Sequence, residues 1–211
     1  MYRASPLVAG TFTMDLFYSH ASPYARTCRV MWREKALHNS VNEIEVNPLE
    51  NPPQLFQRNP LGKIPCLILD NGDDLFDSVV INDYFNQQGT GPDLFAAHQR
   101  DWQVKKWQAL SQGILDVAVQ LRVEKTKPEP QHSALWMQRN RDALMRSAQE
   151  LNTKFDALPT EPCFLSLHLA CAFAYMDFRH AEIAWRHAAP RVAQWYEEIR
   201  HRPSLLATAP K

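Results

Sequence analysis

Three short segments stand out, and two of them carry groups that could hold a small anionic molecule. Ser22 and the pair Asp77-Ser78 each stand where a stretch with helical spacing begins. A hydroxyl group and the unpaired N–H groups of a first helical turn can bind an anion there, helped by the positive end of the helix dipole. These residues are also favoured helix caps, so each pattern admits a purely structural interpretation. The third segment, Ile64-Pro65, is an X–Pro bond, which adopts the cis form at a small cost.

The cysteines point to free thiols and not to a disulfide framework or a metal site. Cys28, Cys66, Cys163 and Cys171 form no CxxC pair, and four cysteines are few for a chain of 211 residues. We expect Cys28 and Cys66 to be small apolar core residues. The spacing of Cys163, His168 and Cys171 fits no tetrahedral zinc pattern, so we expect no bound metal.

Composition excludes several classes of protein. The chain has 23 Lys and Arg against 23 Asp and Glu, and 45% of its residues are apolar. Zero net charge removes the electrostatic footprint of a non-specific nucleic-acid binder. The uncharged stretch from Pro162 to Met176 is too short to span a membrane, and the N-terminus lacks the apolar run of a signal peptide. We therefore expect a cytoplasmic protein with neither nucleic acid nor membrane as partner.

The elements that must position the three segments alternate between strands and helices up to about residue 90. Their expected order is βαβαββα. The expected strands are 15–18, 42–46, 64–69 and 74–76, the last two joined by a two-residue Asn71-Gly72 turn, and the expected helices are 22–37, 51–58 and 78–89. A crossover helix implies a parallel strand pair and a hairpin an antiparallel one, so the sheet should be mixed.

Strand signals end at the Gly89–Pro92 segment, the expected linker, and helical spacing follows. Three sets of apolar residues have helical spacing. Trp107, Leu110, Ile114, Ala118 and Leu121 are expected to share one helix face, and Leu144, Ala148, Leu151, Phe155 and Leu158 another; Val192, Trp195, Tyr196 and Ile199 mark the last long helix. A further buried helix is expected within 164–176, with Ser166 as its N-cap. The second half should therefore be entirely helical.

Several motifs in register resemble one family. Ser22–Arg26 (SPYAR) follows the first strand, Asn59–Pro65 (NPLGKIP) enters the third, and Asp77-Ser78 follows the fourth. This order is similar to the thioredoxin-like domain of cytosolic glutathione S-transferases. Tyr175–Arg179 (YMDFR) and Arg202–Ser204 (RPS) resemble a bacterial branch of that family, with serine at the start of the first helix.

The resemblance covers residues 14 to 211 and implies a domain organisation. It implies a thioredoxin-like, glutathione-binding domain at 14–91 and an all-helical domain at 92–211, with an N-terminal extension at 1–13. One departure concerns the buried helix. Family members usually carry aspartate three residues after its Ser or Thr cap, whereas Leu169 stands three residues after Ser166.

The resemblance also implies how the glutathione thiol is activated. A free thiol is mostly protonated at neutral pH, and a hydrogen-bond donor beside the sulfur favours the reactive thiolate. Ser22 is the expected donor, with Tyr18 at the end of the first strand, or the neighbouring Ser19, as alternatives. Arg26 lies four residues beyond Ser22; it could add positive potential there, but we expect it in a salt bridge or in solvent.

The remaining contacts implied by the resemblance hold the rest of the tripeptide. Ile64-Pro65 would be the family's cis-proline pair, with the Ile64 backbone pairing with the cysteinyl unit. Ser78 would bind the γ-glutamyl carboxylate, Asp77 the ammonium group and Lys63 the glycyl carboxylate.

The activity implied is conjugation of glutathione, as co-substrate, to a small hydrophobic electrophile by a homodimer that needs no other cofactor. The electrophile would lie near the stretch Trp102–Leu115. Two alternatives stay open: a glutathione-dependent disulfide reductase or peroxidase, and a non-enzymatic binding module on the same scaffold.

Overall fold

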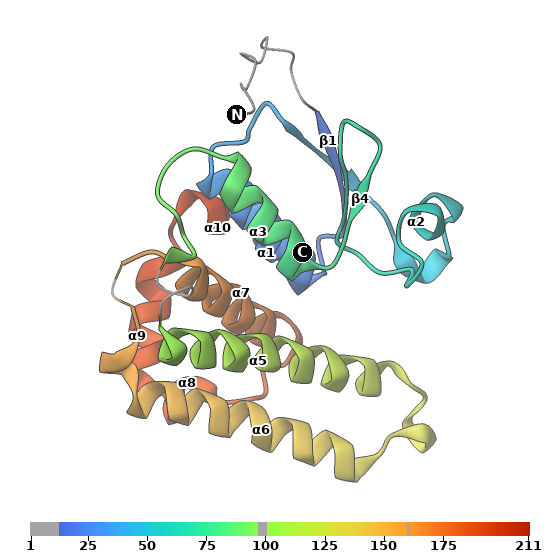
Figure 1. The fold of residues 1–211 in the computed structure, drawn as a ribbon. Helices are drawn as coiled ribbons and strands as arrows, with labels where there is room; N and C mark the ends of the chain where they lie inside the picture. The colour runs from blue at the N-terminus through green and yellow to red at the C-terminus, as the bar shows by residue number, and fades with distance from the viewer. Residues whose placement is uncertain (1–12, 97–100, 160) are drawn as a thin grey trace.

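The computed structural model describes residues 13–96, 101–159 and 161–211. A sheet with flanking helices forms the first part of the chain, and a bundle of helices forms the second (Figure 1). The predicted βαβαββα order and the all-helical second half are both confirmed. The expected extension at residues 1–13 lies, apart from Thr13, outside the described residues.

The sheet is mixed, as predicted. Its strands are β1 (Met14–Tyr18), β2 (Val41–Glu45), β3 (Cys66–Ile68) and β4 (Asp74–Leu75), in the spatial order β2-β1-β3-β4. β1 runs parallel to β2 and antiparallel to β3, and β3 runs antiparallel to β4. Because Phe17 pairs with Cys66, the end of β1 and the beginning of β3 meet at one edge of the sheet.

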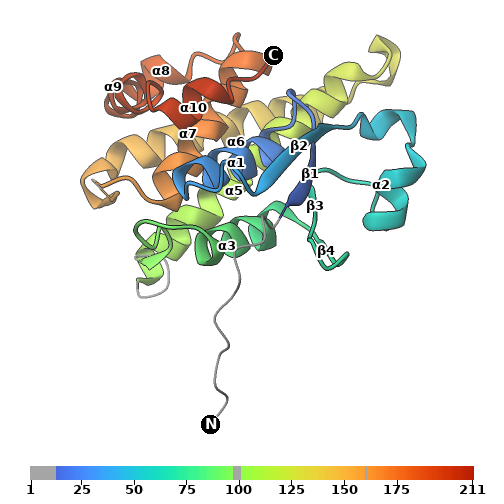
Figure 2. The same ribbon diagram turned by 90° about the horizontal axis from the view of Figure 1, so that it is seen from above.

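Helices cover both faces of this sheet. α1 (Pro23–Glu34) and α3 (Ser78–Gln88) lie side by side on one face, and α2 (Pro53–Arg58) lies on the other (Figures 1 and 2). Successive side chains of β1 point to opposite faces of the sheet. Leu16 joins the main core with Cys28, while Phe17 packs in a smaller cluster with Leu55.

The predicted two-residue turn at Asn71-Gly72 is wrong. The Leu69 N–H donates to Asp73 O, and the Gly72 N–H donates to Leu69 O, so three residues form the loop. Gly72 has φ +86°, a left-handed conformation that suits glycine, and the loop is a β-turn followed by a bulge. The register of β3 against β4 decides the loop length.

Three other elements differ from their predicted ranges by more than one residue. α1 ends at Glu34 instead of residue 37, because the chain turns at Lys35 and Ala36 takes φ +55°. The segment predicted as one short helix at 51–58 is α2, preceded by a 3₁₀ turn at Pro48–Glu50. β3 covers only three residues of the expected strand 64–69.

The second half packs around one buried helix. Its helices are α5 (Trp102–Thr126), α6 (Ala134–Thr153), α7 (Phe164–Arg179), α8 (Trp185–Ala188), α9 (Pro190–Ile199) and α10 (Pro203–Ala207), with 3₁₀ turns at Glu129–Gln131 and Phe155–Ala157. Every residue of α7 from Phe164 to Met176 is buried. None of the described helices is long and apolar enough to cross a membrane.

The predicted N-cap of the buried helix is wrong by three residues. α7 begins at Phe164 with Cys163 as its N-cap, and Ser166 occupies the third helical position. The Ser166 hydroxyl accepts a hydrogen bond from the Cys163 N–H at 2.9 Å. Ser166 therefore supplies the reciprocal bond of a capping box, and Leu169 is simply a core residue.

The predicted linker is held tightly against α1. The buried Lys35 ammonium donates to the Pro92 carbonyl at 2.8 Å, and the Thr90 N–H donates to Lys35 O at 3.0 Å. A Cβ on Gly89 would lie 2.3 Å from the Cβ of Lys35, so only glycine permits this approach.

The end of the chain returns to the first half. Arg202, just before α10, donates to both carboxylate oxygens of Glu34 at 3.0 and 2.6 Å. Burial alone would raise the pKa of Glu34, but the hydrogen bonds from Arg202 and Ser204 bring it below its usual value. These contacts fix the last turn of α1 to the helical half.

Candidate functional site

Ser22 forms the N-cap of α1. Its backbone is extended, with φ −78° and ψ 117°, and its Oγ accepts a hydrogen bond from the Ala25 N–H at 3.1 Å. The O–H proton makes no bond within the described chain, so the hydroxyl can donate while it caps. Ser22 therefore combines an N-cap with a free hydrogen-bond donor at the start of α1.

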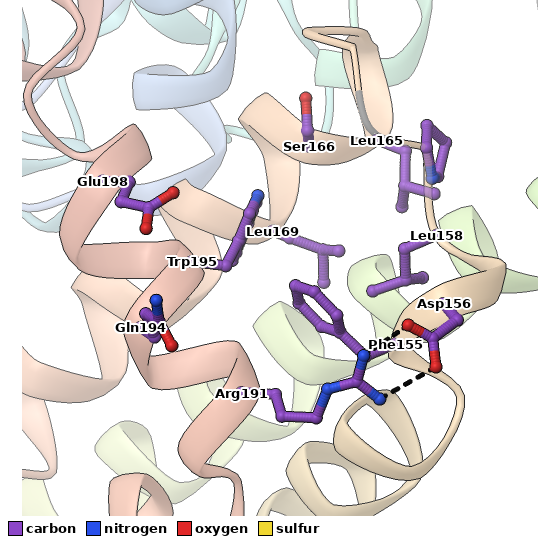
Figure 3. Close-up of a pocket in the computed structure, with 11 residues that line it drawn as sticks. Phe155, Asp156, Leu158, Leu165, Ser166, Leu169, Arg191, Gln194, Trp195 and Glu198 are labelled. Carbon is purple, nitrogen blue, oxygen red and sulfur yellow. Dashed lines mark hydrogen bonds and ion pairs between the residues drawn. The ribbon is translucent and has the colours of Figure 1, made fainter.

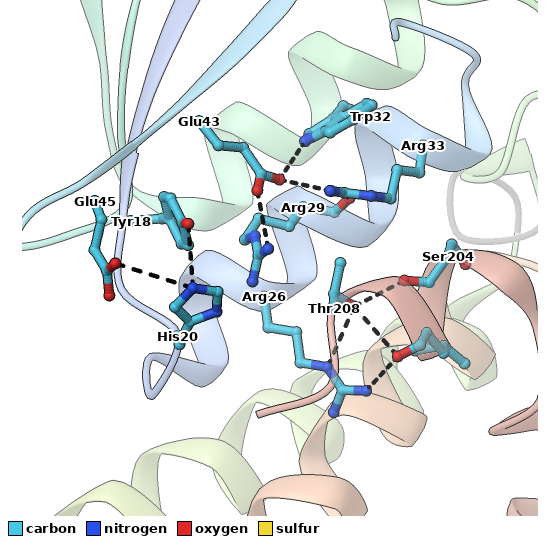
Figure 4. Close-up of polar contacts among 11 residues, drawn as sticks. Tyr18, His20, Arg26, Arg29, Trp32, Arg33, Glu43, Glu45, Ser204 and Thr208 are labelled. Atoms are coloured by element: carbon cyan, nitrogen blue, oxygen red, sulfur yellow. Dashed lines mark hydrogen bonds and ion pairs between the residues drawn. The ribbon is translucent and has the colours of Figure 1, made fainter. Parts of the chain in front are cut away.

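Tyr18 faces a different set of neighbours. Its hydroxyl lies 3.4 Å from His20 Nε2, and the Arg29 guanidinium lies 4.3 Å from its ring centroid (Figure 4). Tyr18 pairs with Glu45 of β2, whereas the Ile64-Pro65 segment adjoins β1 from the opposite side, through β3. Burial raises the pKa of Tyr18 above its usual value of 10.0, which keeps the phenol protonated.

Further along α1, charged side chains tie this helix to the edge strand β2. Glu43 accepts from Arg29 at 2.9 Å, from Arg33 at 2.6 Å and from the Trp32 indole N–H at 3.1 Å (Figure 4). Burial would raise the pKa of Glu43, and the hydrogen bonds from the two arginines lower it below its usual range. This cluster fixes the axis of the helix that Ser22 caps.

The Ile64–Pro65 peptide bond is cis, as the resemblance implied. The loop before it is held by Asn59, a buried residue that our sequence analysis did not single out. Asn59 Nδ2 donates to the Lys63 carbonyl at 2.8 Å, and its Oδ1 accepts from the Leu61 N–H at 3.0 Å. The turn-forming Asn59-Pro60 pair was the available signal. The Lys63 side chain points to solvent without a partner among the described residues.

Asp77 and Ser78 stand at the start of α3. Asp77 is the N-cap and accepts from the Val79 N–H at 3.0 Å, so the cap uses one of its two carboxylate oxygens. Ser78 is 4% exposed, and its hydroxyl has no hydrogen bond within the described chain. Its carbonyl accepts from the Cys28 thiol of α1 at 3.8 Å, which places the first turn of α3 against α1.

The three predicted segments share one region of the fold. The N-terminal ends of α1 and α3 point the same way, close to where β1 ends (Figure 1). Cys66, directly after the cis proline, pairs with Phe17, one residue before the end of β1. Two helix N-termini and the cis-proline segment therefore surround a single end of the sheet.

Arg26 contradicts our prediction of a salt bridge or a solvated side chain. It is 6% exposed and has no ion pair within the described chain. Its Nη2 donates to the Leu205 carbonyl at 3.1 Å, while Nη1 has no partner (Figure 4). Arg26 and Ser22 line one small hollow together with Tyr175, so a buried positive charge accompanies the helix start.

α1 also contacts α5 near this region, which sequence reasoning did not reveal. The Tyr24 hydroxyl donates to Asp116 of α5 at 2.7 Å, and Gln112 donates to the same carboxylate oxygen at 3.1 Å. Burial and the Asp116 hydrogen bond raise the pKa of Tyr24 far above its usual range. This contact fixes the distance between the two halves beside Ser22.

Cys28, Cys66 and His168 are buried in the protein interior. Cys28 and Cys66 are fully buried, as predicted, and burial raises the pKa of the Cys66 thiol to about 11. His168 Nδ1 contacts the Ser111 hydroxyl at 2.6 Å, and its Nε2 contacts Gln112 Oε1 at 3.2 Å. Across the described ranges, no group of His, Cys, Asp and Glu side chains is arranged to hold a metal ion.

Comparisons with known proteins find similar sequences and similar folds. Residues 21–88 match the family model described as glutathione S-transferase, N-terminal domain. A glutathione transferase family member from Pseudomonas fluorescens Pf-5, crystallised with bound glutathione, is 38% identical with a TM-score of 0.88, over 94% of this chain and all of that one. Another structure from that organism, with bound S-(propanoic acid)-glutathione, is 36% identical with a TM-score of 0.83 and covers 94% and 98% of the two chains.

A curated relative extends over nearly the whole chain. The uncharacterised GST-like protein YibF of Escherichia coli K12 is 29% identical over 209 residues, 93% of this chain and 98% of its own. The fold is a thioredoxin-like domain followed by a helical domain, a combination that defines the class of glutathione transferase-like proteins. With 38% identity over essentially complete chains, the protein belongs to the glutathione transferase family.

Proposed function

We propose that the protein binds glutathione at the end of β1 and ionises its thiol there. The observation that carries this proposal is the convergence of the Ser22 hydroxyl, the cis Ile64-Pro65 pair and the unpaired Ser78 hydroxyl around one end of the sheet. Each of these groups matches a different part of the tripeptide. A relative that holds glutathione supports the same ligand here.

At α3, the γ-glutamyl group would take two kinds of contact. The Ser78 hydroxyl and the free N–H groups of the first turn would bind its carboxylate. Asp77 uses one carboxylate oxygen as the N-cap, which leaves the other for the ammonium group.

The rest of the tripeptide would follow the Asn59–Pro65 loop. The main chain of Ile64 would pair with the cysteinyl unit, as an added strand pairs with a sheet edge. The exposed Lys63 ammonium would attract the glycyl carboxylate.

Ser22 would donate its free O–H to the glutathione sulfur and favour the thiolate. The thiolate would then attack an electrophilic carbon of a second substrate and form a thioether as the leaving group departs. S-(propanoic acid)-glutathione, held by one relative, is a sulfur-substituted glutathione of the kind that such a reaction forms. No metal or prosthetic group takes part, and the electrophile would lie along α5.

Three broader assignments belong to the same proposal. The chain would work as a cytoplasmic homodimer, the arrangement implied by its family. Ser22 at the start of α1 supports a place in a bacterial branch that carries serine there.

The high pKa of buried Cys66 argues against a redox role for that thiol, so a disulfide reductase would have to use the glutathione thiol itself.

Calorimetric titration with glutathione tests the binding step. The unmodified protein should bind one glutathione per chain, and Ser78→Ala should bind about tenfold more weakly, since a charge-assisted hydrogen bond is lost. Asn71→Ala, which changes an exposed side chain in the β3–β4 loop, is the matched control and should bind as the unmodified protein does. If the unmodified protein released no heat on titration with glutathione, only one alternative would remain, that of a non-enzymatic binding module.

Parallel assays then separate the reactions. Turnover of a chloronitrobenzene with glutathione would support conjugation, whereas turnover of only a mixed disulfide or a peroxide would overturn it in favour of the reductase or peroxidase.

A further inference from the structure

A cavity in the helical half lies outside the proposed glutathione site. It has a volume of about 480 Å³ and is bounded by the start of α7, one side of α9 and the 3₁₀ turn after α6 (Figure 3). This volume falls within the range typical of small-molecule sites. Its apolar wall consists of Phe155, Leu158, Pro159, Leu165, Leu169 and Trp195.

Fixed contacts shape this cavity before any ligand arrives. The Arg191 guanidinium makes two hydrogen bonds to the Asp156 carboxylate, one of them at 3.0 Å, and lies 4.9 Å from the centroid of the Phe155 ring. The Arg191 N–H also donates to Asn152 Oδ1 at 2.8 Å. These bonds join α9 to the end of α6 and to the turn, so the walls do not depend on a ligand to assemble them.

The charges around the cavity favour a cation. Three charged side chains line it: Arg191, Asp156 and Glu198. The first two neutralise one another, whereas Glu198 has no hydrogen bond or ion pair with any residue that the structure describes. The lining therefore has one uncompensated negative charge, which opposes an anion and attracts a cation.

An aromatic ring stands next to this carboxylate. Trp195 and Glu198 lie three residues apart on α9, so they are neighbours on one face of the helix. Figure 3 shows the Trp195 ring between the Glu198 carboxylate and Leu169. A carboxylate beside the face of an indole, with aliphatic side chains behind it, is the combination that recognises an organic ammonium ion.

We propose that this cavity binds an amphipathic organic cation, with its ammonium group between the Glu198 carboxylate and the Trp195 ring and its apolar body passing the edge of that ring to reach Leu169 and Phe155. The inference does not depend on glutathione binding. The cavity adjoins Leu165 to Leu169 of α7, while the hollow beside Ser22 adjoins Cys171 and Tyr175 of the same helix. The two sites can therefore be occupied independently.

A matched pair of probes tests the proposal. Naphthylmethyl-trimethylammonium and naphthylacetate have the same apolar ring and opposite charges, and each is titrated calorimetrically into the complete protein. The cation should bind at one saturable site, at least tenfold more tightly than the anion. Saturating glutathione should leave the affinity for the cation unchanged.

Variants on α9 locate the site. Glu198→Gln and Trp195→Leu should each weaken cation binding about tenfold, the loss expected for a cation–π or charge contact. Glu197→Gln is the control, because Glu197 is the adjacent acid, pairs with Arg186 and Arg200, and does not line the cavity. It should bind the cation as the unmodified protein does. Thermal unfolding of each variant verifies that it is folded.

Three results would each overturn the proposal: no saturable heat with the cation, equal affinity for the two probes, or unchanged affinity in folded Glu198→Gln. If glutathione competes with the cation, the probe occupies the glutathione site and the cavity assignment is wrong. Glutathione titration of Glu198→Gln should match that of the unmodified protein, so failure of this proposal is distinguishable from failure of the proposed function.

Discussion

The Ser22 hydroxyl caps α1, and its geometry is compatible with the second role proposed for it, donation to the glutathione sulfur. Its oxygen accepts from the Ala25 N–H while its proton stays free. Ser22→Ala should therefore raise the thiol pKa of bound glutathione by about one to two units and lower the stability of the protein by about 1 kcal/mol, the cost of a lost N-cap. The ultraviolet absorbance of the thiolate, followed against pH, measures the first effect, and chemical denaturation measures the second.

Two companion variants make this test specific. Ser22→Thr keeps a hydroxyl that can cap and donate, and it should stay close to the unmodified protein in both measurements. Tyr18→Phe should leave the thiol pKa unchanged, since the Tyr18 hydroxyl is next to His20. Undiminished thiolate formation in Ser22→Ala, with a loss in Tyr18→Phe, would reverse the assignment.

Residue-level predictions from sequence succeeded where the cause is local. Ser22 followed by Pro23 marks a helix start through the chemistry of two adjacent residues. The burial of Arg26 could not be predicted in this way, because Leu205, which accepts its hydrogen bond, is 179 residues away in the chain. Asn59 was overlooked because its side chain holds a loop through two hydrogen bonds, which form only once that loop has folded.

At the scale of elements, α7 has a buried histidine that should make stability depend on pH. Burial lowers the pKa of His168 to about 4, from a usual value of 6.5. Between these two pH values the unfolded chain binds the proton and the folded chain does not, so stability falls as the pH drops from about 6.5 to about 4. The loss should reach a slope of about 1.4 kcal/mol per pH unit for this one group.

Urea denaturation of the protein and of His168→Gln at a series of pH values measures this dependence. Between pH 6.5 and 4, the unfolding free energy of the variant should change less steeply with pH, by about 1.4 kcal/mol per pH unit. Its stability at neutral pH should nevertheless be lower than that of the unmodified protein. An unchanged slope would show that His168 titrates normally in the folded state.

The contact between α1 and α10 supplies a second prediction for the elements. Glu34 is largely buried and receives two hydrogen bonds from Arg202. Arg202→Met should cost about 2 kcal/mol of unfolding free energy, because it leaves a buried carboxylate without its cation. Arg200→Met is the control: its exposed pair with Glu197 should contribute less than about 0.5 kcal/mol. Equal losses in the two variants would contradict this interpretation.

The order of helices and strands could be predicted from the periodicity of apolar residues. The residues at which these elements begin and end were harder to predict. Alternation of strand and helix spacing gave βαβαββα correctly. The Asn71-Gly72 turn was assigned one residue too short because the pairing of Leu67 with Leu75 determines its length. The α7 cap was misplaced since Cys163 is not a typical capping residue and Ser166 is.

For the whole molecule, ligand binding should appear as a gain in stability. A ligand that binds only the folded state at one hundred times its dissociation constant adds about 2.7 kcal/mol. For a chain of this size, glutathione should therefore raise the melting temperature by about 5 to 10 °C. Differential scanning fluorimetry measures the shift, and S-methylglutathione, which lacks a free thiol, should retain most of it. No shift at saturating glutathione would contradict binding.

The return of α10 to α1 has a consequence for how the protein is made. Glu34 is translated 168 residues before Arg202, and Arg26 179 residues before Leu205. While the ribosome extends the chain, the first helix therefore has two charged side chains that lack their final partners. The amino-terminal half can form its sheet early, but it completes its packing only after residues 202–208 have left the exit tunnel.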